Sequence, residues 1–231
     1  MLIFRAWRRV ATLSLIVLAI TLRAEPASAF WLLGFSTADT QPAGTAGFIG
    51  GTGGQLTEAS SKLSFTPYLA HAGLRLGLWD GVDVGYRLCT VALPYNTGGP
   101  TLGGQLDVKL RLTTATAPTG FALGVSGANA FVDFSGQQSV AWSPGAYFIL
   151  SHGVGARVTA SIEGRYVYTW VPGPDNQLHA AGGSAGLKID LHPGLSIRPE
   201  VGFFDFVGTI NGQPANGWGL QYGAVLAARV W

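Results

Sequence analysis

From about Gly44 onward, apolar residues occupy every second position in one segment after another. The clearest example is the stretch 101–112, where apolar side chains alternate with polar ones: Leu102, Leu106, Val108, Leu110 and Leu112 against Gln105, Asp107, Lys109 and Arg111. Successive side chains of a β-strand point to opposite faces, so such a segment has one apolar and one polar face. Alternation over this length predicts strand rather than helix.

Ten segments of this kind follow one another, separated by turn residues: 45–56, 65–78, 82–93, 101–112, 120–134, 139–151, 155–170, 178–191, 195–206 and 217–230. Connections at 79–81, 152–154 and 192–194 are short, and 114–120 is somewhat longer. Those at 93–100, 171–177 and 207–216 are longer and rich in Gly, Pro and Asn. Membrane barrels have short periplasmic turns and longer outer loops, so this rhythm predicts an even-stranded meander. A soluble Greek-key sandwich has no reason to keep it.

The composition of the two faces indicates whether lipid or water surrounds the sheet. The less apolar face holds Gly, Ser and Thr with sparse charges, unlike the Lys- and Glu-rich surface of a soluble sandwich. Aromatic residues near strand ends resemble interfacial girdles: Trp79 and Phe121 at one end, and Tyr68, Trp142, Tyr166, Tyr168, Trp170 and Trp218 at the other. The predicted fold class is all-β, a transmembrane antiparallel up-and-down β-barrel of about ten strands. A soluble exported β-sandwich that binds a ligand is the alternative.

The start of the chain predicts export. Three arginines by position 9 precede an apolar run at 10–22, and "ASA" at 27–29 forms a small-residue cleavage site. We expect 1–29 to be a signal peptide, 30–43 a periplasmic N-terminal segment and 44–231 the barrel domain. Without the signal, 14 basic and 12 acidic residues become 10 and 11, so charge gives no reason to expect nucleic acid as a partner. The single cysteine, Cys89, excludes an internal disulfide.

Four stretches resemble the small Gram-negative outer-membrane β-barrel proteins: "GLRLGLWDGVDVGYRL", "QLDVKLRL", "LSIRPEVGFF" and the terminal "YGAVLAARVW". The resemblance spans essentially the whole mature chain and implies residence in the outer membrane, among its lipid and lipopolysaccharide. It also implies that Trp231 is the signal read by the barrel-insertion machinery. One departure is that the positions in phase with Trp231 are Arg229, Ala227 and Val225, whereas the better apolar series is out of phase. A β-bulge near the end would reconcile the two. The oligomeric state stays open.

The candidate functional residues are charged side chains on the polar strand faces: Arg75, Asp83, Arg87, Asp107, Lys109, Arg111, Arg157, Glu163, Arg165, Lys188, Asp190, Arg198 and Glu200. In one interpretation these charges pair and fill a narrow lumen. In the other they line a small pore for small solutes with a weak anion preference, because cations outnumber carboxylates in the belt near the short turns.

No catalytic residue, metal site or cofactor is predicted. "GGSAG" around Ser184 matches the nucleophile elbow G-x-S-x-G, but an alternating strand follows where the elbow requires a helix. The four histidines lack metal-ligand spacing. A less favoured alternative is a hydrolase of the omptin kind at the extracellular rim, where we expect four groups that could activate water: His179, Asp175, Asp133 and Asp205.

Overall fold

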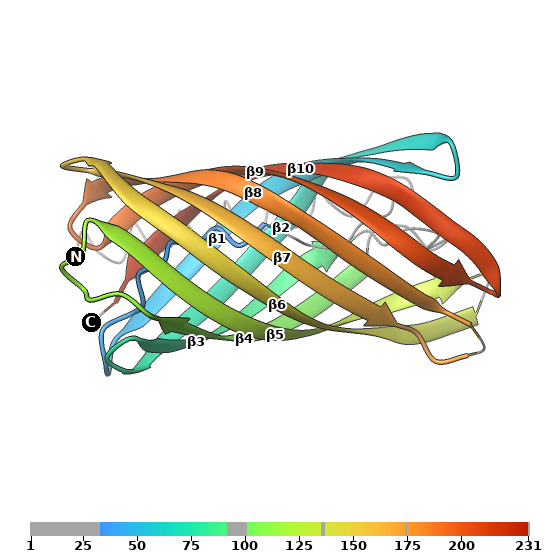
Figure 1. Cartoon of the computed structure of the whole chain (residues 1–231), viewed down its shortest axis with the longest axis horizontal. Helices are drawn as coiled ribbons and strands as arrows, with labels where there is room; N and C mark the ends of the chain where they lie inside the picture. The colour runs from blue at the N-terminus through green and yellow to red at the C-terminus, as the bar shows by residue number, and fades with distance from the viewer. Residues whose placement is uncertain (1–32, 92–100, 135–136, 174, 231) are drawn as a thin grey trace, which may run out of the picture.

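The computed structural model describes residues 33–91, 101–134, 137–173 and 175–230. These residues form ten strands: β1 (Ala46–Ala59), β2 (Lys62–Trp79), β3 (Val82–Val91), β4 (Thr101–Arg111), β5 (Thr119–Phe134), β6 (Gln137–Gly155), β7 (Val158–Trp170), β8 (Gln177–His192), β9 (Leu195–Ile210) and β10 (Gln213–Arg229). Each strand pairs antiparallel with the next. β1 pairs with β10, from Gly47 opposite Arg229 to Ala59 opposite Gly217, which closes the sheet. The predicted up-and-down barrel is confirmed, and its strands are tilted from the long axis (Figure 1), as closure requires.

In the part of the chain that the structure describes, no helix is long and apolar enough to cross a membrane.

The two faces of the barrel wall follow the alternation in the sequence. On β4, Leu106 is 53% exposed and Leu110 is 44% exposed, while Asp107 and Lys109 between them are buried. Other strands repeat the pattern, with large apolar side chains outward. An apolar outer surface of this extent is suited to lipid, since soluble monomers rarely expose patches so large.

Several connections differ from those predicted. The expected loop at 207–216 is a two-residue turn, Asn211-Gly212, with φ of 51° and 72°. An Asn-Gly pair adopts the type I′ geometry that matches hairpin twist, so β9 and β10 continue up to it. The turn expected at 152–154 is instead inside β6, which continues to Gly155, and the chain reverses at Ala156-Arg157.

Aromatic rings lie flat against the inner wall where the neighbouring strand has glycine. A Cβ atom added at Gly124 on β5 would lie 2.1 Å from Cζ of Tyr147 on β6. One added at Gly219 on β10 would lie 2.2 Å from Cζ of Phe204 on β9. The missing side chain therefore makes room for each ring, and the rings occupy wall surface instead of projecting across the lumen.

Candidate functional site

Residues 33–41, which precede β1, lie inside the barrel. Leu33, Phe35, Thr37 and Ala38 are all buried, and the blue segment that precedes β1 follows the inner wall in Figure 1. We call residues 33–41 the N-terminal strap. Of the segment expected at 30–43, residues 33–41 therefore lie in the lumen, where strand side chains supply hydrogen-bond partners for the strap's backbone.

Apolar contacts hold one side of the strap. Leu33 and Phe35 pack against the inward residues Leu69 and Val225. Gly223 leaves the wall open for the Phe35 ring, because a Cβ atom there would lie 2.8 Å from Cζ of that ring. Near the other end of the strap, Ala38 packs in a second cluster with inward residues of β5 and β6: Ala122, Tyr147 and Ile149.

Two side chains of β9 bind the first part of the strap. The carboxylate of Glu200 accepts hydrogen bonds from the backbone N–H groups of Gly34 (3.1 Å) and Phe35 (2.5 Å). It also accepts one from the hydroxyl of Ser184 at 2.5 Å. Two residues along the strand, Arg198 donates to the carbonyl oxygen of Phe35 at 3.1 Å. Glu200 and Arg198 thus bind the N–H groups and the carbonyl of the same short stretch.

Cations of β3 and β4 bind the carbonyl oxygens of the strap. Arg87 donates from Nη1 to the carbonyl of Leu33 at 2.8 Å. The ammonium group of Lys109 donates to the carbonyls of Thr37 (3.0 Å) and Asp39 (2.6 Å) and to the hydroxyl of Ser36 (3.1 Å). Lys109 is 1% exposed, so these bonds satisfy a buried charge. Removal of the strap would leave that charge without three of its partners.

Three further polar contacts bind the strap near the short-turn end of the barrel. The hydroxyl of Ser151 accepts from the backbone N–H of Ala38 at 2.8 Å, and Asp83 accepts from that of Gln41 at 2.9 Å. Arg111 forms an ion pair with Asp39 at 2.7 Å. The strap is therefore bound along its length, from Leu33 to Gln41.

Apart from Arg157, the remaining candidate charges pair with one another, either between strands or along one strand. Arg75 forms ion pairs with Asp83 and, at 2.6 Å, with Asp107, which also accepts the hydroxyl of Tyr147 at 2.6 Å. Arg165 pairs with Glu163 at 2.5 Å and lies over the Tyr147 ring, 4.6 Å from its centre. Lys188 pairs with Asp190 at 3.1 Å. The contacts from Arg75 to Arg165 join strands β2, β3, β4, β6 and β7, whereas Lys188 and Asp190 are both on β8.

One predicted site residue lies elsewhere, and another is outside the described residues. Arg157 is exposed in the β6–β7 turn, because β6 is longer than expected, and it is not a side chain of the strand interior. Trp231 lies outside the described residues. The positions in phase with Trp231 do face inward: Val225 and Ala227 are buried, whereas Leu226 between them faces outward and is 53% exposed.

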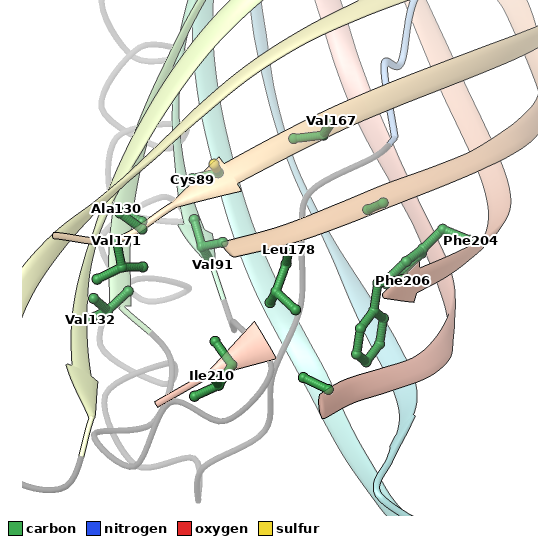
Figure 2. Packing of buried hydrophobic residues seen from close by; sticks show 13 residues of the cluster. Cys89, Val91, Ala130, Val132, Val167, Val171, Leu178, Phe204, Phe206 and Ile210 are labelled. Carbon is green, nitrogen blue, oxygen red and sulfur yellow. The ribbon is translucent and has the colours of Figure 1, made fainter. Parts of the chain in front are cut away.

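Away from the strap the lumen contains a large apolar cluster, which the sequence interpretation missed, beside buried polar side chains such as Gln55, Thr57 and Gln221. The apolar collar comprises thirteen buried residues, twelve from strands β3 and β5 to β10 and Val171 just after β7: Cys89, Val91, Ala130, Val132, Ala141, Val167, Val171, Leu178, Ala180, Phe204, Phe206, Ile210 and Ala215. Figure 2 shows these side chains on the inner side of the wall. The sequence of β9 could have predicted the collar. The strand face that presents Ser196, Arg198 and Glu200 goes on to present Phe204 and Phe206. The charged side chains of the interior lie in one half of the barrel, and the apolar collar lies in the other.

The groups that suggested chemistry are used in other ways. Ser184 lies inside strand β8 and donates to Glu200, so no nucleophile elbow forms there. Nδ1 of His179 lies 2.6 Å from the hydroxyl of Tyr166, and its ring lies 5.0 Å from that of Tyr168. Within the described residues, no group of three His, Cys, Asp or Glu side chains could hold a metal ion.

A closed antiparallel barrel with an apolar outer surface and ion pairs in its lumen is the architecture of the small β-barrel proteins of the Gram-negative outer membrane, and this chain has that form. No protein-family model matches the sequence, and no curated protein matches it significantly.

Solved structures similar to the chain include three barrels. The N-terminal barrel domain of OprF from Pseudomonas aeruginosa is 11% identical, with 81% of this chain and 99% of that chain covered and a TM-score of 0.36. Neisserial surface protein A is also 11% identical, covering 79% of this chain and 96% of its own, with a TM-score of 0.35. The translocator domain of NalP from Neisseria meningitidis is 11% identical over 84% of this chain and 91% of its own, with a TM-score of 0.41. Each likeness concerns the fold alone.

Proposed function

We propose that the protein is a narrow outer-membrane pore for small solutes whose lumen is closed at rest by the N-terminal strap. The observation that carries the proposal is the position of the strap, whose backbone is hydrogen-bonded to inward side chains of β3, β4, β6 and β9. A peptide held across the lumen obstructs passage while these bonds persist. Since none of them is covalent, the strap can leave while the β1–β10 seam stays closed.

A weak anion preference would follow once the strap leaves. Arg87, Lys109 and Arg198 donate to strap carbonyls, and these partners depart with the strap. The carboxylates that stay in the wall are largely engaged with other cations, as in the Arg75–Asp107 and Arg165–Glu163 pairs. Inward cations then exceed the carboxylates available to them, which favours anions.

The apolar collar is a second barrier in series with the strap. A narrow apolar section of a pore resists filling by water, which raises the barrier for hydrated ions more than for small uncharged solutes. The selectivity for anions over cations should therefore be modest, and the conductance low even with the strap displaced.

We also propose that residues 1–29 direct export and are removed, and that the barrel-insertion machinery places the barrel in the outer membrane. Cell fractionation tests this location. Boiled and unboiled samples on an SDS gel test the closed barrel, which should migrate differently before and after boiling. A soluble periplasmic protein without a mobility shift would contradict the proposal.

The first test of the pore replaces the strap residues 33–41 by a Gly/Ser segment of equal length. In planar bilayers under a KCl gradient, we expect steady conductance with a reversal potential on the anion side, against rare openings for the unaltered protein. The SDS mobility shift serves as the control for folding. A folded variant that does not conduct would contradict the pore and leave a structural role for the barrel.

The second test locks the strap in place. A Cβ atom built at Gly120 lies 2.9 Å from Cβ of Ala38, so small shifts would give the spacing of about 3.5–4.5 Å that a disulfide needs. With Cys89→Ser in the background, Ala38→Cys/Gly120→Cys should lose its openings when oxidised and regain them on reduction. Each single cysteine variant is a control, and its openings should not change when the oxidant is added. Equal conductance in both redox states would exclude the strap as the gate.

A further inference from the structure

A cavity of about 480 Å³ lies between the strap and the short-turn end of the barrel. Its wall includes Phe35 and Ser36 of the strap, the turn residues Arg157 and Gly194, and inward side chains of β8 and β9. With the short turns on the periplasmic side, as the pattern of connections predicts, this end faces the periplasm. The cavity is on the opposite side of the strap from the apolar collar, so it does not need the pore to open.

Basic side chains dominate the charge of this cavity. Six arginine and lysine residues line it, against two carboxylates: Arg75, Arg87, Arg157, Lys188, Arg198 and Arg229 against Asp107 and Asp190. The two carboxylates already pair with Arg75 and Lys188. Among the described residues, no carboxylate lies within ion-pair distance of the other four cations. The cavity therefore carries an excess of positive charge, which its low-dielectric walls concentrate.

The cations differ in how firmly they are held. Arg198 is oriented by two bonds, from Nη1 to the carbonyl of Phe35 at 3.1 Å and from Nε to the hydroxyl of Ser196 at 3.3 Å. These bonds leave its Nη2 group for another acceptor. Arg157 and Arg229 are exposed at the rim, where their long side chains can close over a bound group. The hydroxyl of Ser36 is a further polar group of the wall.

We propose that this cavity binds a phosphate-type oxyanion that enters from the short-turn end. A tetrahedral oxyanion offers several acceptor oxygens to the guanidinium groups, which bind phosphate through paired N–H donors. Chloride would gain only from the net charge, so affinity should rise with the charge and the number of oxygens of the ion. The phosphate group could belong to a free anion or to the headgroup of an inner-leaflet lipid.

The test is calorimetric titration of inorganic phosphate and pyrophosphate into the full barrel in maltoside detergent, at constant ionic strength. We expect saturable binding, tighter for pyrophosphate. The double variant Arg157→Gln/Arg229→Gln, which changes only exposed side chains, should bind about tenfold more weakly or worse. Arg198→Gln should bind as weakly as that variant.

Lys62→Gln is the control, because Lys62 is an exposed cation that neither lines the cavity nor contacts the strap. It should keep the affinity of the unaltered protein. Absence of saturable pyrophosphate binding would overturn the proposal, as would equal losses in the control and the cavity variants.

A competition separates the two sources of phosphate. Phosphatidylglycerol added to the micelles should displace pyrophosphate if a lipid headgroup reaches the cavity, and should leave its affinity unchanged if only free anions do. Both results support an oxyanion cavity and differ only in the occupant. Since the assay measures binding in detergent, a barrel that does not conduct can still bind the oxyanion, so failure of the pore and failure of the cavity are distinguishable.

Discussion

The carboxylate of Glu200 lies 2.5 Å from the backbone nitrogen of Phe35, although the two residues are 165 positions apart in the chain. This contact joins the ninth strand of the barrel to the segment that precedes the first. Glu200 binds the adjacent N–H of Gly34 as well, so one side chain satisfies two backbone donors inside the lumen. Contacts of this kind hold the strap inside the lumen.

Glu200→Gln should loosen the strap without opening the barrel. The amide keeps one acceptor oxygen but loses the charge, and hydrogen bonds to charged groups contribute about 1.5–3 kcal/mol. We expect the strap to leave its site about ten to a hundred times more often. The measurement is the rate of maleimide labelling at Ala38→Cys in a Cys89→Ser background. Glu58→Gln, near the far end of β1, is the control, and an unchanged labelling rate in Glu200→Gln would contradict the role of Glu200.

Lys109→Glu/Arg198→Glu should reverse the ion preference of the strap-replaced barrel. Both side chains face the lumen and bind strap carbonyls in the closed state. With the strap replaced, their charges act on permeating ions instead. Reversal potentials under a KCl gradient should move from the anion to the cation side. Lys62→Glu, in an exposed position where β2 begins, should leave the preference unchanged. A double variant that still prefers anions would mean that other charges set the selectivity.

The collar should limit conductance once the strap has gone. Val91→Thr/Val167→Thr replaces two methyl groups of the collar by hydroxyl groups at nearly constant volume, so the lumen should wet more readily. Single-channel conductance of the strap-replaced barrel should rise severalfold. Val201→Thr makes the same change on the outer face of β9, where the side chain is 48% exposed, and should have no effect on conductance. Equal conductance with and without the two collar substitutions would show that the collar does not limit conductance.

Gly124→Ala should destabilise the barrel. The added Cβ would meet Cζ of Tyr147 at 2.1 Å, so the ring must move and its hydrogen bond to Asp107 must lengthen or break. We expect a loss of about 1–3 kcal/mol in unfolding free energy, measured by urea titration in detergent. Gly127→Ala, on the same strand, is the control because a Cβ there would meet nothing within 4 Å. Equal stability of the two variants would show that the ring yields without strain.

The strands were predictable because alternation is a local property. Leu106 and Asp107 differ in polarity, and their place on opposite faces follows from backbone geometry alone. Strand ends were less predictable. The Asn211-Gly212 turn and the Ala156-Arg157 turn depend on how far neighbouring strands keep pairing, which moved Arg157 from a wall position to an exposed turn.

The strap was not predictable from residues 33–41. Its sequence, "LGFSTADTQ", has no alternation and no charge cluster that points to Glu200 or Lys109. Those partners lie on β9 and β4, and only closure of the barrel places them around one lumen. The sequence did indicate that Glu200 and Lys109 face the lumen, where a charged side chain needs a partner. It did not indicate which group that partner is.

By itself, the sequence determined the class of fold and the direction of nearly every strand side chain, because a period of two residues is set by the extended backbone. Tertiary structure decided which charges meet, where the apolar collar forms and what fills the lumen. These outcomes depend on the register between strands and on the closure of β1 against β10, which bring together groups separated by up to the length of the barrel domain. A charged side chain enclosed in a narrow lumen must find a partner there, and for Glu200 and Lys109 that partner is the backbone of the strap.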